Sequence, residues 1–347
     1  MTVFASRFTM GMPTRNQSGG SRSRGLFRAC LLLGASAMAA AVPLGAQAAY
    51  PEKPIQVTIS FPPAGATDVL ARAVGNQLSA ELGQSVVVEN RPGAGGAIGL
   101  MAGARAAPDG YGLYLAATTN QAIAAAIYKN QAASLEKDFI PIGLIGSVPH
   151  SLVVPASLPV NSVQELLAYI REKPGQYNFA SQGVGTLSHL EGEMFKAQNK
   201  LDITHVPYKG SVQALPDVVN GLSVMMFDSV TGSMPLVKGN KLKYLAVASS
   251  SRVSLLPDVP TLKEAGVENV VADNLFGLFA PLGTPPEIVR QLSSALARAL
   301  EKPKLIEAMA AQGAELQFGP PEQLAKTVAD EHIFWRDVVK RAGIPPQ

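Results

Sequence analysis

The chain has 347 residues, of which 47% are hydrophobic and 16% charged, so it is long enough to bury a sizeable core. Five arginines and no acidic residue lie in the first 48 positions, so removing that segment changes the formal net charge from +3 to −2. The remainder has no run of like charges to bind nucleic acid or a membrane surface, and its lack of cysteine excludes disulfides and thiolate metal sites.

The N-terminal segment has the pattern of an export signal. Its arginines precede an apolar, alanine-rich run, Ala29–Leu44, which is short for a membrane-spanning helix. Ala46-Gln47-Ala48 then supplies the small-x-small pattern that signal peptidase cleaves. We therefore expect a signal peptide over residues 1–48, cleavage near Ala48 and a periplasmic mature protein.

Short apolar runs alternate with amphipathic stretches along the rest of the chain, which indicates an α/β fold with mostly parallel strands. Strands are predicted at Ile55–Phe61, Ser85–Val88, Gly112–Ala116, Ile142–Ile145, Leu152–Val154, Tyr177–Ala180, Ile203–Val206, Ser223–Phe227, Tyr244–Ala248 and Leu275–Ala280. Helices are predicted at Asp68–Leu82, Ala97–Ala106, Val163–Lys173, Ser188–Lys200, Val212–Asn220, Thr261–Ala265, Pro286–Glu301, Pro303–Gln312 and Glu322–Ala342.

Two extended stretches, Ser147–Pro155 and Val270–Asn274, are candidates for connections between two lobes. If the chain crosses at both, the first lobe is discontinuous. The expected organisation is lobe 1 from residues 49–148 plus 275–347, and lobe 2 from residues 149–274.

Two glycine-containing loops are candidate ligand contacts, because ligands of α/β sheets bind where strands lead into helices. Pro62–Asp68 follows the first predicted strand, and Ser181–His189 repeats the pattern in the other lobe. Small residues in both loops let backbone N–H groups approach a ligand, and the helix N-termini favour an anion. Asp68 is as readily interpreted as a cap of its own helix, and Phe276 as a core residue. The full set of expected ligand-binding residues is Pro63, Ala64, Gly65, Ala66, Thr67, Asp68, Thr119, Asn120, Ser181, Gln182, Gly183, Gly185, Thr186, Ser188, His189, Asp228 and Phe276.

Enzymatic alternatives find less support. Ser188, His189 and Asp228 are the residue types of a hydrolase, but there is no GxSxG motif, and adjacent helical residues point about 100° apart. The Gly183–Ser188 stretch is nearly a dinucleotide fingerprint, but it lacks the acidic residue that holds the ribose. The four histidines have no i,i+4 pair and no HExxH motif, so no metal is expected.

Several segments, taken in order, resemble one family. They are AYPEKPI (49–55), FPPAGATD (61–68), ENRPGAGGAIG (89–99), APDGYGL (107–113), SQGVGTLSHL (181–190), VPYKGSVQALPDVVNG (206–221), LPDVPTLKEAG (256–266) and APLGTPPEIV (280–289). Together they resemble the substrate-binding receptors of tripartite tricarboxylate transporters, the Bug receptors. Ala64 departs from the family pattern, which usually has a glycine there.

That resemblance implies a type II periplasmic binding protein fold, with two α/β lobes around a central cleft. It also implies a non-enzymatic, monomeric receptor that binds a small organic carboxylate without a cofactor and delivers it to membrane transporter subunits. A ligand sensor for a signalling system is the alternative.

Overall fold

The computed structural model describes residues 50–128, 130–268, 270 and 273–344. The expected signal peptide, 1–48, lies outside these residues, so export remains a prediction. Within the described part of the chain, no helix combines the length and the apolar character that a membrane span requires.

The first half of the fold is a sheet built on β1 (Ile55–Ile59). β1 pairs in parallel with β2 (Val86–Asn90) and β3 (Gly112–Ala117), and β3 pairs antiparallel with β9 (Asp273–Pro281). The helices that belong to this half are α1 (Ala66–Leu82), the short η1 (Ala94–Gly96), α2 (Ala97–Ala104), α9 (Pro286–Leu300) and α10 (Pro303–Ala310). Apolar faces of β1, α1 and α9 form one buried cluster, which fixes where the turn between β1 and α1 emerges.

The second half repeats this plan around β5 (Tyr177–Ser181). β5 pairs in parallel with β6 (Ile203–Pro207) and β7 (Met225–Ser229). The remaining elements are α5 (Val163–Glu172), α6 (Leu187–Gln198), α7 (Ser211–Val219), α8 (Val230–Lys238) and β8 (Leu242–Val247). A separate apolar cluster, which includes Phe179, Phe195 and Phe227, fills this half.

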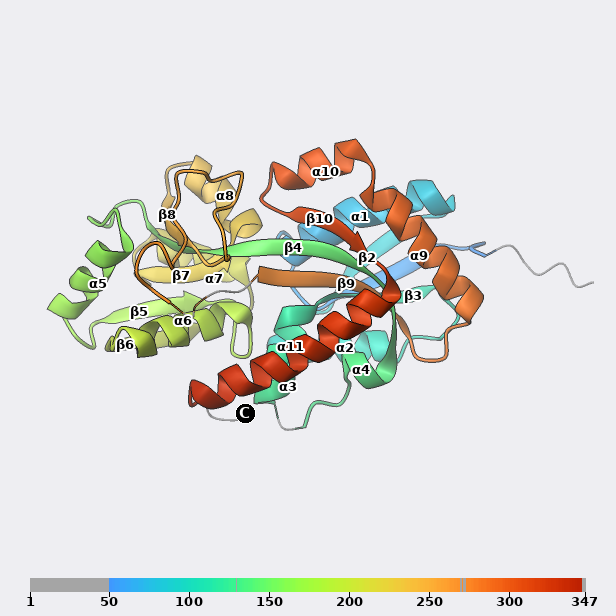
Figure 1. Cartoon of the computed structure of the whole chain (residues 1–347), viewed down its shortest axis with the longest axis horizontal. Coiled ribbons are helices and arrows are strands. Elements are labelled where there is room, and N and C mark those ends of the chain that lie inside the picture. The colour runs from blue at the N-terminus through green and yellow to red at the C-terminus, as the bar shows by residue number, and fades with distance from the viewer. Residues whose placement is uncertain (1–49, 129, 269, 271–272, 345–347) are drawn as a thin grey trace, which may run out of the picture. The chain divides into compact units, whose positions relative to one another are not determined.

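One strand joins the two halves. β4 (Phe139–Pro155) is 17 residues long and lies beside β9 in Figure 1. Its first part pairs with β9 as far as Pro149 opposite Asp273, and from His150 onward it pairs with β7 and β8. β10 (Glu315–Gly319) also pairs with β4.

The prediction of two short strands in this region was wrong, because Ile142–Ile145 and Leu152–Val154 are parts of β4. Proline tends to mark the end of a strand, but Pro149, between the two predicted strands, pairs with Asp273 of β9, and the strand continues from His150 beside β7. The expectation of mostly parallel strands was also wrong: β4 and β9 are antiparallel to each other and to their other partners.

Three further helices complete the described fold: α3 (Thr118–Ile127), α4 (Leu135–Asp138) and α11 (Pro321–Arg341). α11 lies along α3 and buries Trp335 and Val338. The helix predicted at Thr261–Ala265 is instead a series of turns. Glu264 and Thr261 exchange the hydrogen bonds of a helix start, but Gly266 then takes a positive φ and ends the segment.

Candidate functional site

Two adjoining cavities lie where loops of the first sheet meet loops of the second. The smaller has a volume of about 20 Å³ and the larger about 260 Å³. The smaller cavity is lined by Phe61, Pro62, Gly65, Ala66, Thr67, Gln182, Gly210, Ser211, Val212, Ser229 and Asn274. The larger is lined by Ser60, Phe61, Pro62, Pro92, Gly93, Ala94, Gly95, Gly96, Tyr128, Gln182, Gly183, Val184, Thr186, Pro207, Tyr208 and Lys209.

The first predicted loop borders the smaller cavity, but only in part. Gly65, Ala66 and Thr67 line it at the N-terminus of α1. Pro63 and Ala64 are exposed and line neither cavity. The loop therefore presents backbone and small side chains to the cavity.

Asp68 does not line either cavity but holds this loop through hydrogen bonds of its carboxylate. Its buried carboxylate accepts hydrogen bonds from the Ala64 amide at 3.0 Å and from Asn90 at 2.9 Å, and it pairs with Arg72 at 2.8 Å. Burial opposes ionisation of Asp68, but the bonds from Arg72, Ala64 and Asn90 prevail and hold its pKa below the ordinary value. Asp68 thus stabilises the start of its own helix, which was the alternative interpretation of the sequence.

Three helix N-termini converge on the smaller cavity. α1 begins at Ala66, α7 at Ser211 and α8 at Val230, immediately after Ser229. The first N–H groups of a helix have no intrahelical acceptor and carry a partial positive charge. No lysine or arginine lines this cavity, and Lys209 borders only its larger neighbour. The arrangement favours an anion held by amides.

The second predicted loop lies at the larger cavity. Gln182, Gly183 and Thr186 line it, and Gln182 also borders the smaller one. The first residues of α6, Leu187 and Ser188, however, line neither cavity. The Leu187 amide donates to Asn120 Oδ1 at 2.8 Å. In the second half, the helix N-termini at the smaller cavity are those of α7 and α8, whereas the sequence analysis expected that of α6.

Other members of this loop have structural partners. Gly185 packs against Tyr128 with φ +79°, a conformation that favours glycine. Ser181 contacts His205 Nε2 at 2.7 Å, and Ser188 donates to the Phe227 carbonyl. None of the three lines either cavity.

The hydrolase alternative has no geometric support among the described residues. The Ser188 hydroxyl is bound to a backbone carbonyl, and the His189 ring stacks on His205 with centroids 4.3 Å apart. No hydrogen bond joins Ser188, His189 and Asp228 in this part of the chain.

His189, His205 and Glu193 are the one group of described side chains whose ligand atoms could converge on a metal, within 4.8 Å of one another. Burial lowers the pKa of His189 to about 4, and burial with the neighbouring His189 and Lys196 lowers that of His205 to about 3. Both rings are therefore neutral at physiological pH. A metal lies in the plane of each imidazole that binds it, whereas these rings stack face to face, so the arrangement fits packing better than coordination.

Asp228 lies behind the smaller cavity. It is fully buried, and its Oδ1 accepts hydrogen bonds from Gln182 at 2.7 Å and from Ser211. Burial raises its pKa, while the bonds from Ser211 and Gln182 oppose that change. The carboxylate orients two residues that line the cavity.

Thr119, Asn120 and Phe276 lie beside or away from the cavities. The Thr119 hydroxyl bonds backbone groups of β9 and the Glu331 carboxylate. Asn120 bridges Asn274, which does line the smaller cavity, to Leu187. Phe276 is fully buried in the core of the first half.

The sequence interpretation missed the most prominent feature of the site, the Gly210-Ser211 start of α7. The segment from Val206 to Gly221 carries the same signal as the two predicted loops, a strand followed by glycine and then a helix. Gly210 sits at φ +114°, and a Cβ there would lie 3.0 Å from the Pro62 ring, so the two halves meet closely at this glycine.

Two α/β halves joined by β4, with cavities between their loops, are the architecture of the class of periplasmic solute-binding proteins and confirm the expected fold class. Over residues 70–344 the sequence matches the family described as the tripartite tricarboxylate transporter family receptor. The chain belongs to that family, whose members are solute receptors.

Individual relatives agree with this assignment. BugT of Bordetella pertussis strain Tohama I is 36% identical over 295 residues, which cover 85% of this chain and 90% of BugT. The R. palustris protein Rpa4515, solved with adipate, is 34% identical with a TM-score of 0.83 and covers 86% of this chain and all of its own. MatC from Rhodopseudomonas palustris, solved with bound malate, is 32% identical with a TM-score of 0.78 and covers 84% of this chain and all of its own.

Proposed function

We propose that this protein is a periplasmic receptor that closes on a small organic dicarboxylate and delivers it to the membrane subunits of a tripartite tricarboxylate transporter. It acts as a monomer and does not transform its ligand. The moving bodies are lobe 1, residues 49–148 plus 275–347, and lobe 2, residues 149–274.

The observation that carries this proposal is the convergence of three helix N-termini on one cavity that has no cationic side chain. A carboxylate there replaces its water with fixed amide donors, each worth about 1.5–3 kcal/mol in a charge-assisted bond. Micromolar affinity requires about 8 kcal/mol, so four or five such bonds suffice after ordering costs.

The sizes of the cavities favour a small acid. The larger cavity, about 260 Å³, is below the usual range of about 300–1,000 Å³ for small-molecule sites. Adipate and malate, the ligands of two relatives, are of the appropriate class. The ligand's second polar end would lie in the larger cavity, near Tyr128, Thr186 and Lys209.

A pair of substitutions at Ser211 tests whether a backbone amide binds the ligand. Ser211→Pro removes the N–H at the first position of α7, where proline is well tolerated, and also removes the hydroxyl. Ser211→Ala removes only the hydroxyl, which donates to Asp228. If the amide binds a carboxylate, Ser211→Pro weakens binding by about 10- to 150-fold beyond Ser211→Ala.

The measurement is isothermal titration of mature protein with adipate, malate and a panel of di-, tri- and aromatic carboxylates. The tightest ligand should also raise Tm by several degrees at 100 times its Kd. Equal affinities of the two Ser211 variants would remove this amide from the site, and a panel without any binder would contradict the proposed function.

A further inference from the structure

A third cavity, larger than the two that face the loops, lies apart from them. We call it the α6–α11 pocket. It has a volume of about 790 Å³ and is lined by Glu191, Met194, Ala197, Gln198, Lys263, Glu268, Val270, Phe334, Trp335, Val338, Arg341 and Ala342. None of these residues lines the proposed carboxylate site.

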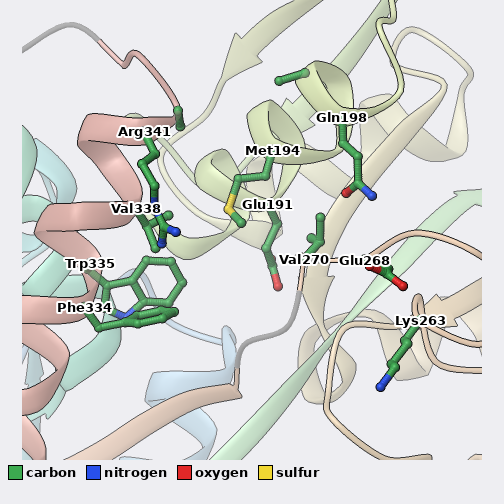
Figure 2. Close-up of a pocket in the computed structure, with 12 residues that line it drawn as sticks. Glu191, Met194, Gln198, Lys263, Glu268, Val270, Phe334, Trp335, Val338 and Arg341 are labelled. Atoms are coloured by element: carbon green, nitrogen blue, oxygen red, sulfur yellow. The ribbon is translucent and has the colours of Figure 1, made fainter.

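The pocket has an apolar wall and a deep acidic group. Figure 2 shows Phe334, Trp335 and Val338 of α11 facing Met194 of α6 across the opening, with the Glu191 carboxylate directed into the space between them. Glu191 is only 1% exposed, so bulk water has little access to its carboxylate. The inner end of the pocket is therefore both apolar and acidic.

Only one of the two carboxylate oxygens of Glu191 has a hydrogen-bond partner among the described residues. Its Oε2 contacts His150 Nδ1 at 2.7 Å, while Oε1 has no hydrogen-bond partner among the described residues. A buried acceptor without a donor is unfavourable, and the occupant that relieves it must bring an N–H or O–H group. A cationic donor gains most, because it meets a carboxyl group in a pocket that Phe334 and Trp335 also line.

The charges at the mouth restrict the occupant further. Lys263, Arg341 and Glu268 are exposed and give the rim one net positive charge. A polyamine would place its second charge beside this rim, whereas a single ammonium group at the inner end avoids it. The volume fits a compound with an apolar body, because sites for such molecules span about 300–1,000 Å³.

We propose that the α6–α11 pocket is a second ligand site, specific for a primary monoammonium compound with an apolar or aromatic body, whose ammonium group binds Glu191. The site lies apart from the carboxylate site and does not rest on the function proposed for it, although its walls come from both lobes.

Matched probe compounds test this inference. Trp335 is the only tryptophan in the sequence and lies in the pocket wall, so its fluorescence reports occupancy. Titration of full-length mature protein with 4-phenylbutylammonium should give a saturable change, confirmed by calorimetry. 4-Phenylbutanoate, with the same body and the opposite charge, and spermidine should each bind at least tenfold more weakly. Excess adipate should not displace the amine.

Two comparisons test whether the amine binds in this pocket: Glu191→Gln with wild type, and Phe334→Ala with Ile333→Ala. Glu191→Gln should weaken the amine by about tenfold or more, because an amide presents less negative charge to the ammonium group. Phe334→Ala removes a half-exposed aromatic side chain that lines the pocket. Ile333→Ala removes a side chain of similar exposure that does not line it. Phe334→Ala should weaken binding several-fold and Ile333→Ala should not.

The Phe334 and Ile333 pair decides the question even if Glu191→Gln does not fold. Absence of saturable amine binding would overturn the inference. So would equal binding of the amine and the acid, or strictly competitive displacement of the amine by adipate. Equal affinity of Phe334→Ala and wild type would also overturn it.

Discussion

Asn120→Ala is expected to weaken carboxylate binding, although Asn120 lines neither cavity. Asn120 belongs to α3 of the first half, and its Oδ1 accepts the Leu187 amide of α6 in the second half at 2.8 Å. Its Nδ2 donates to Asn274 at 3.1 Å, beside the smaller cavity. The bond to Leu187 joins the two halves, so it contributes only when they are together.

The magnitude follows from the bonds that are lost. Each buried hydrogen bond contributes about 0.5–1.5 kcal/mol, so the loss of both bonds of Asn120 costs about 1–3 kcal/mol. Where the unliganded receptor is mainly open, this cost falls on ligand binding and raises Kd by about 5- to 150-fold. An alanine leaves the Leu187 amide without its acceptor in the closed form.

Titration calorimetry of the wild type and of Asn120→Ala with the best carboxylate ligand measures the effect. Asn178→Ala is the matched control, because Asn178 lies at the exposed side of β5 and makes one long bond, 3.5 Å, within its own half. A Kd that is the same for Asn120→Ala and Asn178→Ala would refute the argument that this bond belongs to the closed form.

Two further predictions concern stability. Ala64 has φ +66°, which costs an L-residue about 1–2 kcal/mol, so Ala64→Gly should raise Tm by about 1–3 °C in calorimetry after the entropic cost of glycine; a lower Tm would show that the loop is not strained. Burial raises the pKa of Glu331 to about 7, against hydrogen bonds from Thr119, Thr118 and Trp335. The folded protein then holds a proton that the unfolded chain releases, so stability should fall as pH rises from about 4.5 to 7. Glu331→Gln should flatten that fall in urea unfolding at several pH values, and parallel curves for both proteins would contradict the assigned pKa.

The sequence predicted most elements of the two halves, because their hydrophobic periodicity is local. In β4, where the prediction failed, a long-range contact decided the conformation. β4 reads as two strands interrupted by prolines, and only pairing with β9, more than a hundred residues away in sequence, makes it continuous. α8 went unnoticed because Pro235 lies inside it, and α3 because its alanine-rich sequence has no polar face.

The predicted ligand-binding residues stay a prediction, and the structure places only some of them, such as Gly65 and Gln182, at the two cavities. The signal used to find them was a helix start after glycine. The same signal occurs three times, however, and nothing local distinguishes a helix start that faces the cavity from one bound by a partner. The Leu187 amide is bound by Asn120, which lies 67 positions earlier in the chain. Ser211, at the start of α7, lines the smaller cavity, whereas Leu187 does not. Which N-terminus stays free is therefore a property of tertiary packing.

If the proposed site is correct, the division of donors between the halves predicts how it binds and releases its ligand. α1 comes from the first half, and α7 and α8 come from the second, so neither half alone completes the set. An ammonium or guanidinium group would attract the ligand even in the open form, because a full charge acts over about 8–10 Å at physiological salt. Amide donors act only within hydrogen-bond distance. Opening by a few ångströms therefore removes most of the attraction, and the affinity of the closed form need not slow release once the halves separate.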